Sequence, residues 1–553
     1  MLIDVLLRCA VLSGSKRRQK MNATDIRPSI VIANLQTGLD LLSSLPLADP
    51  RQAEVELNQF LDSLLQTPPP VDVYLNLLEQ SRLPLCFVEE ELAQHYVNKP
   101  LPLGAIEEEC FRQVVITWLK TARAYAHCAQ LDNATDDPGH SSRAALILHR
   151  CIYYTGMVMV EHHRARRELP SGFWHDLHAH YASVEKQGVA TVTVADALDP
   201  LGRTTHCMAA FLALLLSELA SPYSLSIRDQ SLVRRWANHW SPLLNLHAAL
   251  PGESLPPFVI DLMQDAGLSS SADCPQTESL RRLDTSRLAV QLNQIRQQLS
   301  QRISPAQIGL GEDCTSGQCN RLLAHIASPW SQAHATRKFP RHDTAGVARL
   351  CVGFEAMHYY ISGKEFTQPE SGRLYSTQEI ESLSTFRHMV DPSQTLQLRQ
   401  EQLGFTADQW EMINHSANGF RLMRCVAGNK IAHGQLVAIC PHDGEHFLLA
   451  KTSWLMQEPD EGLIAGVATL PGMPQAIAAR RTGPEIAHNE RFSRAFLLPA
   501  MPAVGTEQSL VIPQGWYRTG HCIEIHTDAV RRVKLGHVLD DGADFERVSF
   551  TAT

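Results

Sequence analysis

The hydrophobic period of this 553-residue sequence changes part-way along the chain, and that change limits the folds open to it. From about residue 36 to residue 303 apolar residues recur at helical spacing, and the clearest stripe is Phe111, Val114, Val115, Trp118, Leu119 and Ala122. From residue 413 onward, short runs rich in strand-forming residues follow one another, such as GQLVAIC and GLIAGVATL. The pattern predicts an α+β protein with an N-terminal all-α helical domain, a small antiparallel β-barrel and extra C-terminal strands.

Further helices are expected wherever the helical period continues between Pro-containing breaks such as TPPP. The segments are 51–66, 71–82, 143–168, 173–187, 205–220, 228–240 and 284–302. The last of them carries an apolar seam formed by Leu288, Leu292, Ile295 and Leu299. Such a seam can pack inside the domain or pair with a second copy of the chain, so a homodimer is one expectation.

The domain boundaries follow from these changes in pattern. We expect a poorly ordered segment at 1–35, in which Met21 is an alternative start, then the helical domain at 36–303 and a junction at 304–336. The barrel is assigned to 337–480, with a helix in FEAMHYYISG and an insertion at 364–410 opened by a capping box from Ser376 to Glu379. A β-rich extension occupies 481–553, and hairpin turns are expected at Asp443-Gly444 and Asp541-Gly542.

Charge and composition exclude several classes of protein. A net charge of −9 gives no general attraction to DNA, RNA or anionic lipid, although a local basic patch can still bind one compact anion. The 13 cysteines show no CxxC pair and no regular spacing, which indicates reduced thiols and a cytoplasmic protein. The longest apolar run, at 208–216, falls far short of the roughly 20 residues that span a bilayer, so no transmembrane segment is expected. The N-terminal basic cluster follows the first apolar run, the wrong order for a secretory signal.

Two short motifs carry the chemistry. Arg337 and Arg341 form an R-x-x-x-R pair before a strand-like run, and Asn414, Ser416 and Gly419 form N-x-S-x-x-G in INHSANGFRLM. A guanidinium binds phosphate through two hydrogen bonds and stacks on a nucleobase, so two arginines can hold a nucleotide dianion. Asn and Ser add directional hydrogen bonds, and Gly allows an unusual φ or the close approach of a ligand. The alternative is that the arginines are solvated and that the second motif is an Asx turn.

Together these motifs resemble the PilZ family of cyclic di-GMP receptors, whose signature is R-x-x-x-R before the first strand and D/N-x-S-x-x-G at the next. The resemblance covers roughly 337–480. It implies a six-stranded β-barrel whose arginine-bearing linker holds a cyclic di-GMP dimer or monomer against the barrel through Arg337, Arg341, Asn414, Ser416 and Gly419. This sequence departs from the family in one respect, because 72 residues separate Arg341 from Asn414. The insertion at 364–410 is the expected cause.

The resulting hypothesis is a cytoplasmic, non-enzymatic receptor that couples cyclic di-GMP to a helical output or partner-binding domain, with no cofactor and no metal. A rival hypothesis is a ligand-free scaffold in which the helical domain binds proteins constitutively. A second rival is an enzyme that uses a His or Cys cluster. The candidates for such a cluster, Cys314 with Cys319 and His175 with His178, have neither zinc-finger nor H-E-x-x-H spacing.

Overall fold

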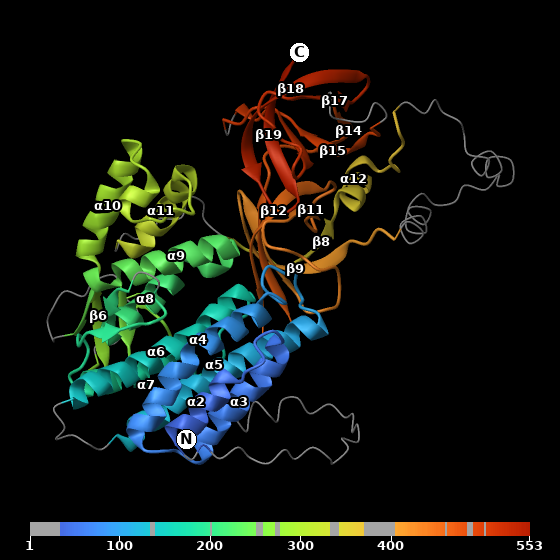
Figure 1. Ribbon diagram of the computed structural model, residues 1–553. Coiled ribbons are helices and arrows are strands. Elements are labelled where there is room, and N and C mark those ends of the chain that lie inside the picture. The colour runs from blue at the N-terminus through green and yellow to red at the C-terminus, as the bar shows by residue number, and fades with distance from the viewer. Residues whose placement is uncertain are drawn as a thin grey trace, which may run out of the picture.

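The computed structural model describes residues 32, 34–132, 139–199, 202–249, 258–270, 277–331, 342–369, 404–458, 462–483, 490–502 and 505–553. Helices and barrels form separate parts of the molecule, and the first barrel lies between the helices and the second barrel (Figure 1). Arg337, Arg341, the Ser376–Glu379 capping box and nearly all of segment 1–35 lie outside the described residues.

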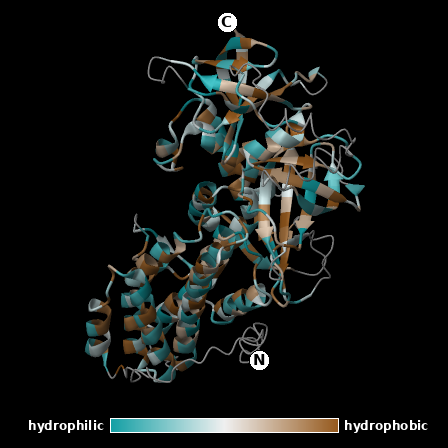
Figure 2. Ribbon diagram, turned by 90° about the vertical axis from the view of Figure 1, so that its right-hand side faces the viewer, coloured by the Kyte–Doolittle hydropathy of each residue, from teal (hydrophilic) through white to brown (hydrophobic). Residues whose placement is uncertain are grey.

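Ten α-helices precede the first barrel in the described part of the chain, and they confirm the helical N-terminal domain. They are α2 (Leu35–Ser43), α3 (Pro50–Gln66), α4 (Val71–Ala93), α5 (Ala105–Leu131), α6 (His140–Arg164), α7 (Phe173–Lys186), α8 (Cys207–Leu219), α9 (Ile227–Trp240), α10 (Ser286–Ser300) and α11 (Ser316–Trp330). Local sequence fixes several starts: Asp49 caps α3 ahead of Pro50 at the first helical position. Apolar stretches alternate with polar ones along these helices (Figure 2), and the apolar stripes merge into one core.

A small sheet accompanies the helices, which the all-α expectation for this region missed. Its strands are β3 (Asn245–Ala248), β4 (Phe258–Asp261), β5 (Ser269–Ser270) and β6 (Leu280–Asp284), in the order β3-β6-β4-β5. A separate hairpin joins β1 (Val194–Ala195) to β2 (Thr204–Thr205). These strands are two to five residues long, too short for a period of two to stand out in the sequence.

The first barrel is built from β7 (His342–Asp343), β8 (Val347–Val352), β9 (Asp408–Ser416), β10 (Gly419–Arg424), β11 (Leu436–Cys440), β12 (Leu448–Gln457) and β13 (Leu463–Thr469). The sheet order is β10-β13-β12-β11-β8-β9-β7, and an additional pairing of β10 with β9 closes six of the strands into a ring. The predicted antiparallel barrel is therefore confirmed. Helix α12 (Phe354–Ser362) follows β8, as FEAMHYYISG predicts, and Asp443-Gly444 lies between β11 and β12.

The C-terminal strands form a second closed barrel, in the order β14-β15-β16-β19-β18-β17. They are β14 (Gln475–Arg481), β15 (Ser493–Leu498), β16 (Ser509–Pro513), β17 (Cys522–His526), β18 (Val530–Asp541) and β19 (Phe545–Ala552). All of β14 except Arg481 falls within the range 337–480 assigned to the first barrel, but β14 pairs with β15 and β17 of the second. A shared apolar cluster joins the two barrels and includes Met357 of α12, Leu449 of β12 and Phe496 of β15.

Backbone hydrogen bonds join the helical domain to the first barrel at two places. Leu101, between α4 and α5, exchanges two hydrogen bonds of 2.8 Å with Ile431 and belongs to the barrel core. Gln457 at the end of β12 donates to the carbonyl of Arg166 at 2.8 Å, just beyond α6. The barrel is therefore held on the helices at both seams. No helix within the described ranges is long and apolar enough to cross a membrane.

Candidate ligand-binding site

The motif N-x-S-x-x-G forms the hairpin between β9 and β10. Asn414 and Ser416 belong to the end of β9, and Ser416 pairs with Gly419, the first residue of β10. The Ser416 hydroxyl donates to Asn418 Oδ1 at 2.9 Å across the two-residue turn. All three motif residues are half-buried at one end of the barrel wall. The turn interpretation and the ligand interpretation are compatible here, because both Asn414 and Ser416 keep some exposed surface.

The packing of neighbouring strands explains why the last position of this motif, residue 419, is a glycine. A Cβ added at Gly419 would lie 2.3 Å from the carbonyl oxygen of Val467 on β13, the neighbouring strand. Gly419 is not among the residues with positive φ, so backbone freedom is not what selects it. Close approach of β10 to β13 is enough to require glycine, whether or not a ligand also approaches this position.

Strand β7 brings a distant segment of the chain to this hairpin. His342 pairs with His415 and Asp343 pairs with Asn414 in antiparallel register. The two histidine rings lie 5.7 Å apart, and the Thr344 hydroxyl is hydrogen-bonded to His415 Nδ1. In the sequence Arg341 directly precedes His342. His342, the residue that follows the arginine motif, therefore lies beside the strand that carries Asn414, although the long insertion separates the two in the sequence.

Arg421 on β10 and Trp454 on β12 lie on the outer face of the barrel, on either side of β13. Leu422 is fully buried in the barrel core, so its neighbour Arg421 faces outward, as does Asn414, which pairs with Arg421. The Arg421 guanidinium lies 5.7 Å from the Trp454 ring centroid. Arg421 Nε is buried and has no hydrogen-bond partner among the described residues.

The position of Trp454 depends on Gly466 of β13, which has no side chain. Gly466 pairs with both Arg421 and Trp454, and a Cβ at Gly466 would lie only 1.9 Å from Trp454 Nε1. The indole therefore lies across the position a side chain would fill. Sequence reasoning missed Arg421 and Trp454. Arg421 was detectable as the outward position two residues after Gly419, whereas the pairing of Trp454 with Gly466 depends on a β-bulge in β12.

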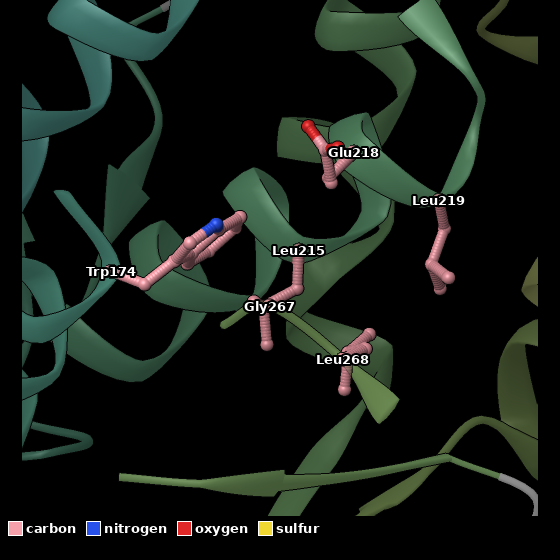
Figure 3. Close-up of a pocket in the computed structure, with 6 residues that line it drawn as sticks. All are labelled: Trp174, Leu215, Glu218, Leu219, Gly267 and Leu268. Carbon is pink, nitrogen blue, oxygen red and sulfur yellow. The ribbon is translucent and has the colours of Figure 1, made fainter. Parts of the chain in front are cut away.

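The helical domain contains a cavity of a different character (Figure 3). It has a volume of about 160 Å³ and is lined by Trp174, Leu215, Glu218, Leu219, Gly267 and Leu268. Glu218 lies 2.9 Å from His163 Nε2. Burial acts to raise the pKa of Glu218, but the hydrogen bond and the charge of His163 outweigh it and the net pKa is lowered. An ionised carboxylate in an apolar wall repels phosphate, so this cavity does not suit a nucleotide dianion.

The remaining candidates from the sequence fall in two places. His178 is fully buried and its Nδ1 lies 3.1 Å from the carbonyl of Gln264, while His175 is exposed on the same helix. Cys314 and Cys319 lie together at the start of α11. Within the described ranges, no three His, Cys, Asp or Glu side chains are grouped so that they could hold a metal ion. None of these residues contributes to the hairpin site.

Comparison with known proteins matches most of the chain, in three parts. Residues 37–251 match the family model "Cyclic-di-GMP receptor FimW, N-terminal domain", and 477–553 match "FimW C-terminal beta-barrel domain". Residues 258–371 match "Cyclic-di-GMP receptor FimW, middle PilZ domain". The chain therefore resembles the PilZ-domain family in its middle part. It is 23% identical over 536 residues to the cyclic-di-GMP receptor FimW of Pseudomonas aeruginosa, covering 89% of this chain and 86% of that protein.

The matched ranges can be compared with the helices and strands of this chain. The middle match ends at residue 371, so it includes β7, β8 and α12 but stops before β9 to β13 complete the barrel. The N-terminal match starts within α2, and the C-terminal match starts within β14. The chain thus matches an N-terminal domain, a middle PilZ domain and a C-terminal β-barrel domain, in that order.

Proposed function

We propose that this PilZ-domain protein is a cyclic di-GMP receptor whose ligand lies on the outer face of the first barrel, beside β7 and the β9–β10 hairpin. The pairing of His342 with His415 carries the proposal. Arg341 is one residue from His342 in the sequence, and successive Cα atoms are about 3.8 Å apart. Chain connectivity therefore limits how far Arg341 can lie from Asn414 and Ser416, despite the insertion. The name of the Pseudomonas aeruginosa relative supports the choice of ligand.

Each part of the site has a distinct task in this proposal. Arg337 and Arg341 bind the phosphates, and each charge-assisted hydrogen bond contributes about 1.5–3 kcal/mol. The side chains of Asn414 and Ser416 bind polar edges of a guanine. Arg421 on β10 and Trp454 on β12 add a flat, cationic surface across β13, suited to stacking on a second base. The same face thus offers charge, hydrogen bonds and stacking.

We further infer that β12 couples the ligand to the helical domain. Trp454 on the outer face and Gln457 at the helical seam are three residues apart on this strand. Gln457 bonds to the backbone of Arg166, and the Arg166 side chain donates to the carbonyls of Tyr223 and Leu225 at 2.7 and 2.8 Å. A shift of Trp454 on ligand binding would therefore reach the loop after α8 through one continuous strand. Coupling requires that the ligand bind the two arrangements with different affinity.

A cytoplasmic location and a partner-binding role for the helical domain complete the proposal. The described cysteines form no disulfide, as expected in a reducing compartment. The first experiment is calorimetric titration of the full chain with cyclic di-GMP, comparing wild type with Arg337→Ala and Arg341→Ala. Arg296→Ala is the matched control, because Arg296 is an exposed arginine on α10, in the helical domain.

The expected result is saturable binding by wild type and Arg296→Ala, and binding weakened at least tenfold in both motif variants. Absence of heat and of any thermal shift in folded wild-type protein would reject the receptor proposal and favour the ligand-free scaffold. Equal affinity in all four proteins would instead place a ligand site elsewhere on the chain.

A further inference from the structure

Two cysteines lie at the start of α11, at positions that normally hold an apolar pair. Thr315 is the N-cap of α11, and its side chain accepts a hydrogen bond from the backbone N–H of Gln318. Cys314 precedes this cap and Cys319 is the fourth residue of the helix, which are the two positions of a hydrophobic staple. The staple geometry brings the two sulfur atoms within 3.0 Å of each other. They are not bonded, because a disulfide bond is about 2.05 Å long.

The loop before α11 is held in place from both sides. The Arg235 side chain on α9 donates to the carbonyl of Leu310 at 3.2 Å and to Asp313 Oδ1 at 2.7 Å. Trp236 Nε1 donates to the same Leu310 carbonyl at 3.0 Å. At the other end of α11, Trp330 Nε1 donates to the carbonyl of Leu216 at 2.9 Å. The surrounding contacts therefore keep the two thiols together without any covalent bond.

The two thiols differ in ways that give them different chemical roles. Cys319 is fully buried, whereas 8% of Cys314 is exposed. Burial raises the pKa of Cys319 to about 12, and its S–H donates to the sulfur of Cys314. Cys314 therefore meets an oxidant first, with a hydrogen-bond donor directed at its sulfur, and Cys319 is positioned to react with the product. Among the eleven described cysteines, this is the pair whose sulfur atoms are in contact.

We propose that Cys314 and Cys319 are a reversible oxidation site, at which a peroxide converts the two thiols into an intrachain disulfide. The Cys314 sulfur attacks one oxygen of the peroxide, the O–O bond breaks and water leaves, which produces a sulfenic acid. The Cys319 sulfur then attacks the Cys314 sulfur, and the S–O bond breaks as a second water leaves. The thiols lose two electrons and two protons, and the peroxide is reduced to two waters. A small-molecule dithiol reverses the reaction by thiol–disulfide exchange.

The sequence allows a direct test in the full-length protein. Reduced protein is treated with hydrogen peroxide, alkylated and digested with trypsin, and cleavage after Arg302 and Arg321 releases peptide 303–321. This peptide contains both cysteines and no third. The expected product is two hydrogens lighter than the reduced peptide and carries no alkyl group. Dithiothreitol treatment before alkylation should restore two alkyl groups.

Two internal comparisons make the test decisive. Cys425 is exposed, so its oxidation reports that the peroxide dose was effective. In Cys319→Ser, Cys314 should be oxidised to sulfinic or sulfonic acid, or remain alkylatable, but should form no intrapeptide bond. The proposal is overturned if wild-type peptide 303–321 keeps two alkyl groups at a dose that oxidises Cys425. It is equally overturned if Cys314 forms a disulfide with a cysteine other than Cys319.

Discussion

His342 lies opposite His415 in the sheet, with the two rings 5.7 Å apart, although a long insertion separates them in the sequence. β7 and β8 both pair with β9, so the chain returns after the insertion to the strands it left. A closed barrel tolerates this because an insertion between neighbouring strands need not alter their register, and a longer loop costs little additional entropy. The separation of two motifs along the chain is thus a poor guide to their separation in space.

The first prediction concerns Trp454. Trp454→Ala should weaken cyclic di-GMP binding by about tenfold or more, because stacking of a base on an aromatic ring contributes about 1–3 kcal/mol. Trp454→Phe keeps an aromatic face and should recover most of the affinity. Calorimetric titration measures both.

A matched control exists in the second barrel, where the Arg481 guanidinium lies 5.6 Å from the Trp516 ring centroid. Trp516→Ala removes the same kind of pair away from the hairpin and should leave the affinity unchanged. Equal losses in Trp454→Ala and Trp516→Ala would show that the effect comes from general destabilisation, and the stacking role would be withdrawn.

Gly419→Ala should destabilise the first barrel even without ligand. The new methyl group would meet the Val467 carbonyl at 2.3 Å, and this oxygen belongs to the backbone of β13, so β10 and β13 must separate. We expect a loss of about 1–3 kcal/mol in the free energy of unfolding, measured by urea denaturation. Gly317→Ala is the control, because no atom lies within 4 Å of a Cβ there and α11 is helical. A stable Gly419→Ala protein that has lost only ligand binding would instead assign this glycine to the ligand.

Leu101→Ala tests the seam between the helical domain and the barrel. Leu101 is 1% exposed and packs inside the barrel core with Ile431, although it belongs to the loop between α4 and α5. Truncation should cost about 2–5 kcal/mol and lower the midpoint of the barrel's thermal transition. The half-buried neighbour Leu103 provides the comparison, since Leu103→Ala removes the same atoms from a less enclosed position. If the Leu101 variant were as stable as wild type, the barrel would not depend on the helices at this seam.

Much of the fold could be predicted from the sequence because helices and turns are determined by residues that are close together along the chain. Helical periodicity located the main helices, and the glycine after Asp443 and after Asp541 marked hairpins of the two barrels. Closure of the C-terminal strands into a second barrel was not predicted, because it depends on the pairing of β14 with β17, which are far apart in the sequence. Short runs of β-formers show that strands exist but not which strands pair.

In the candidate site, too, only residues that form a local motif could be predicted from the sequence. Asn414, Ser416 and Gly419 were predicted because they form a recognisable spacing, and they remain a prediction together with Arg337 and Arg341. Arg421 and Trp454 carried no motif, since they meet through Gly466 on a third strand. Register across three strands is a property of the folded sheet, and a β-bulge in β12 shifts it by one residue.

A buried carboxyl in the helical domain gives the last prediction. Glu89 on α4 is 1% exposed, so its carboxyl is shielded from water. Burial raises the pKa of Glu89 well above that of an ordinary glutamate, and the nearby carboxyls of Glu54 and Glu161 raise it further. The folded protein therefore holds this proton more tightly than the unfolded chain does.

The sign of the pH dependence follows from linkage. Below the ordinary glutamate pKa of 4.5, both states are protonated and the stabilisation is fully present. As pH rises, the unfolded chain releases the proton first, so stability falls by up to about 1.4 kcal/mol per pH unit until the folded pKa is passed. Glu89→Gln cannot lose a proton, and its free energy of unfolding should therefore fall less between about pH 5 and pH 8. Urea denaturation across this range measures both slopes, and Glu91→Gln, at an exposed position of the same helix, should keep the wild-type slope. Identical slopes for wild type and Glu89→Gln would mean that Glu54 and Glu161, whose pKa values burial also raises, account for the dependence.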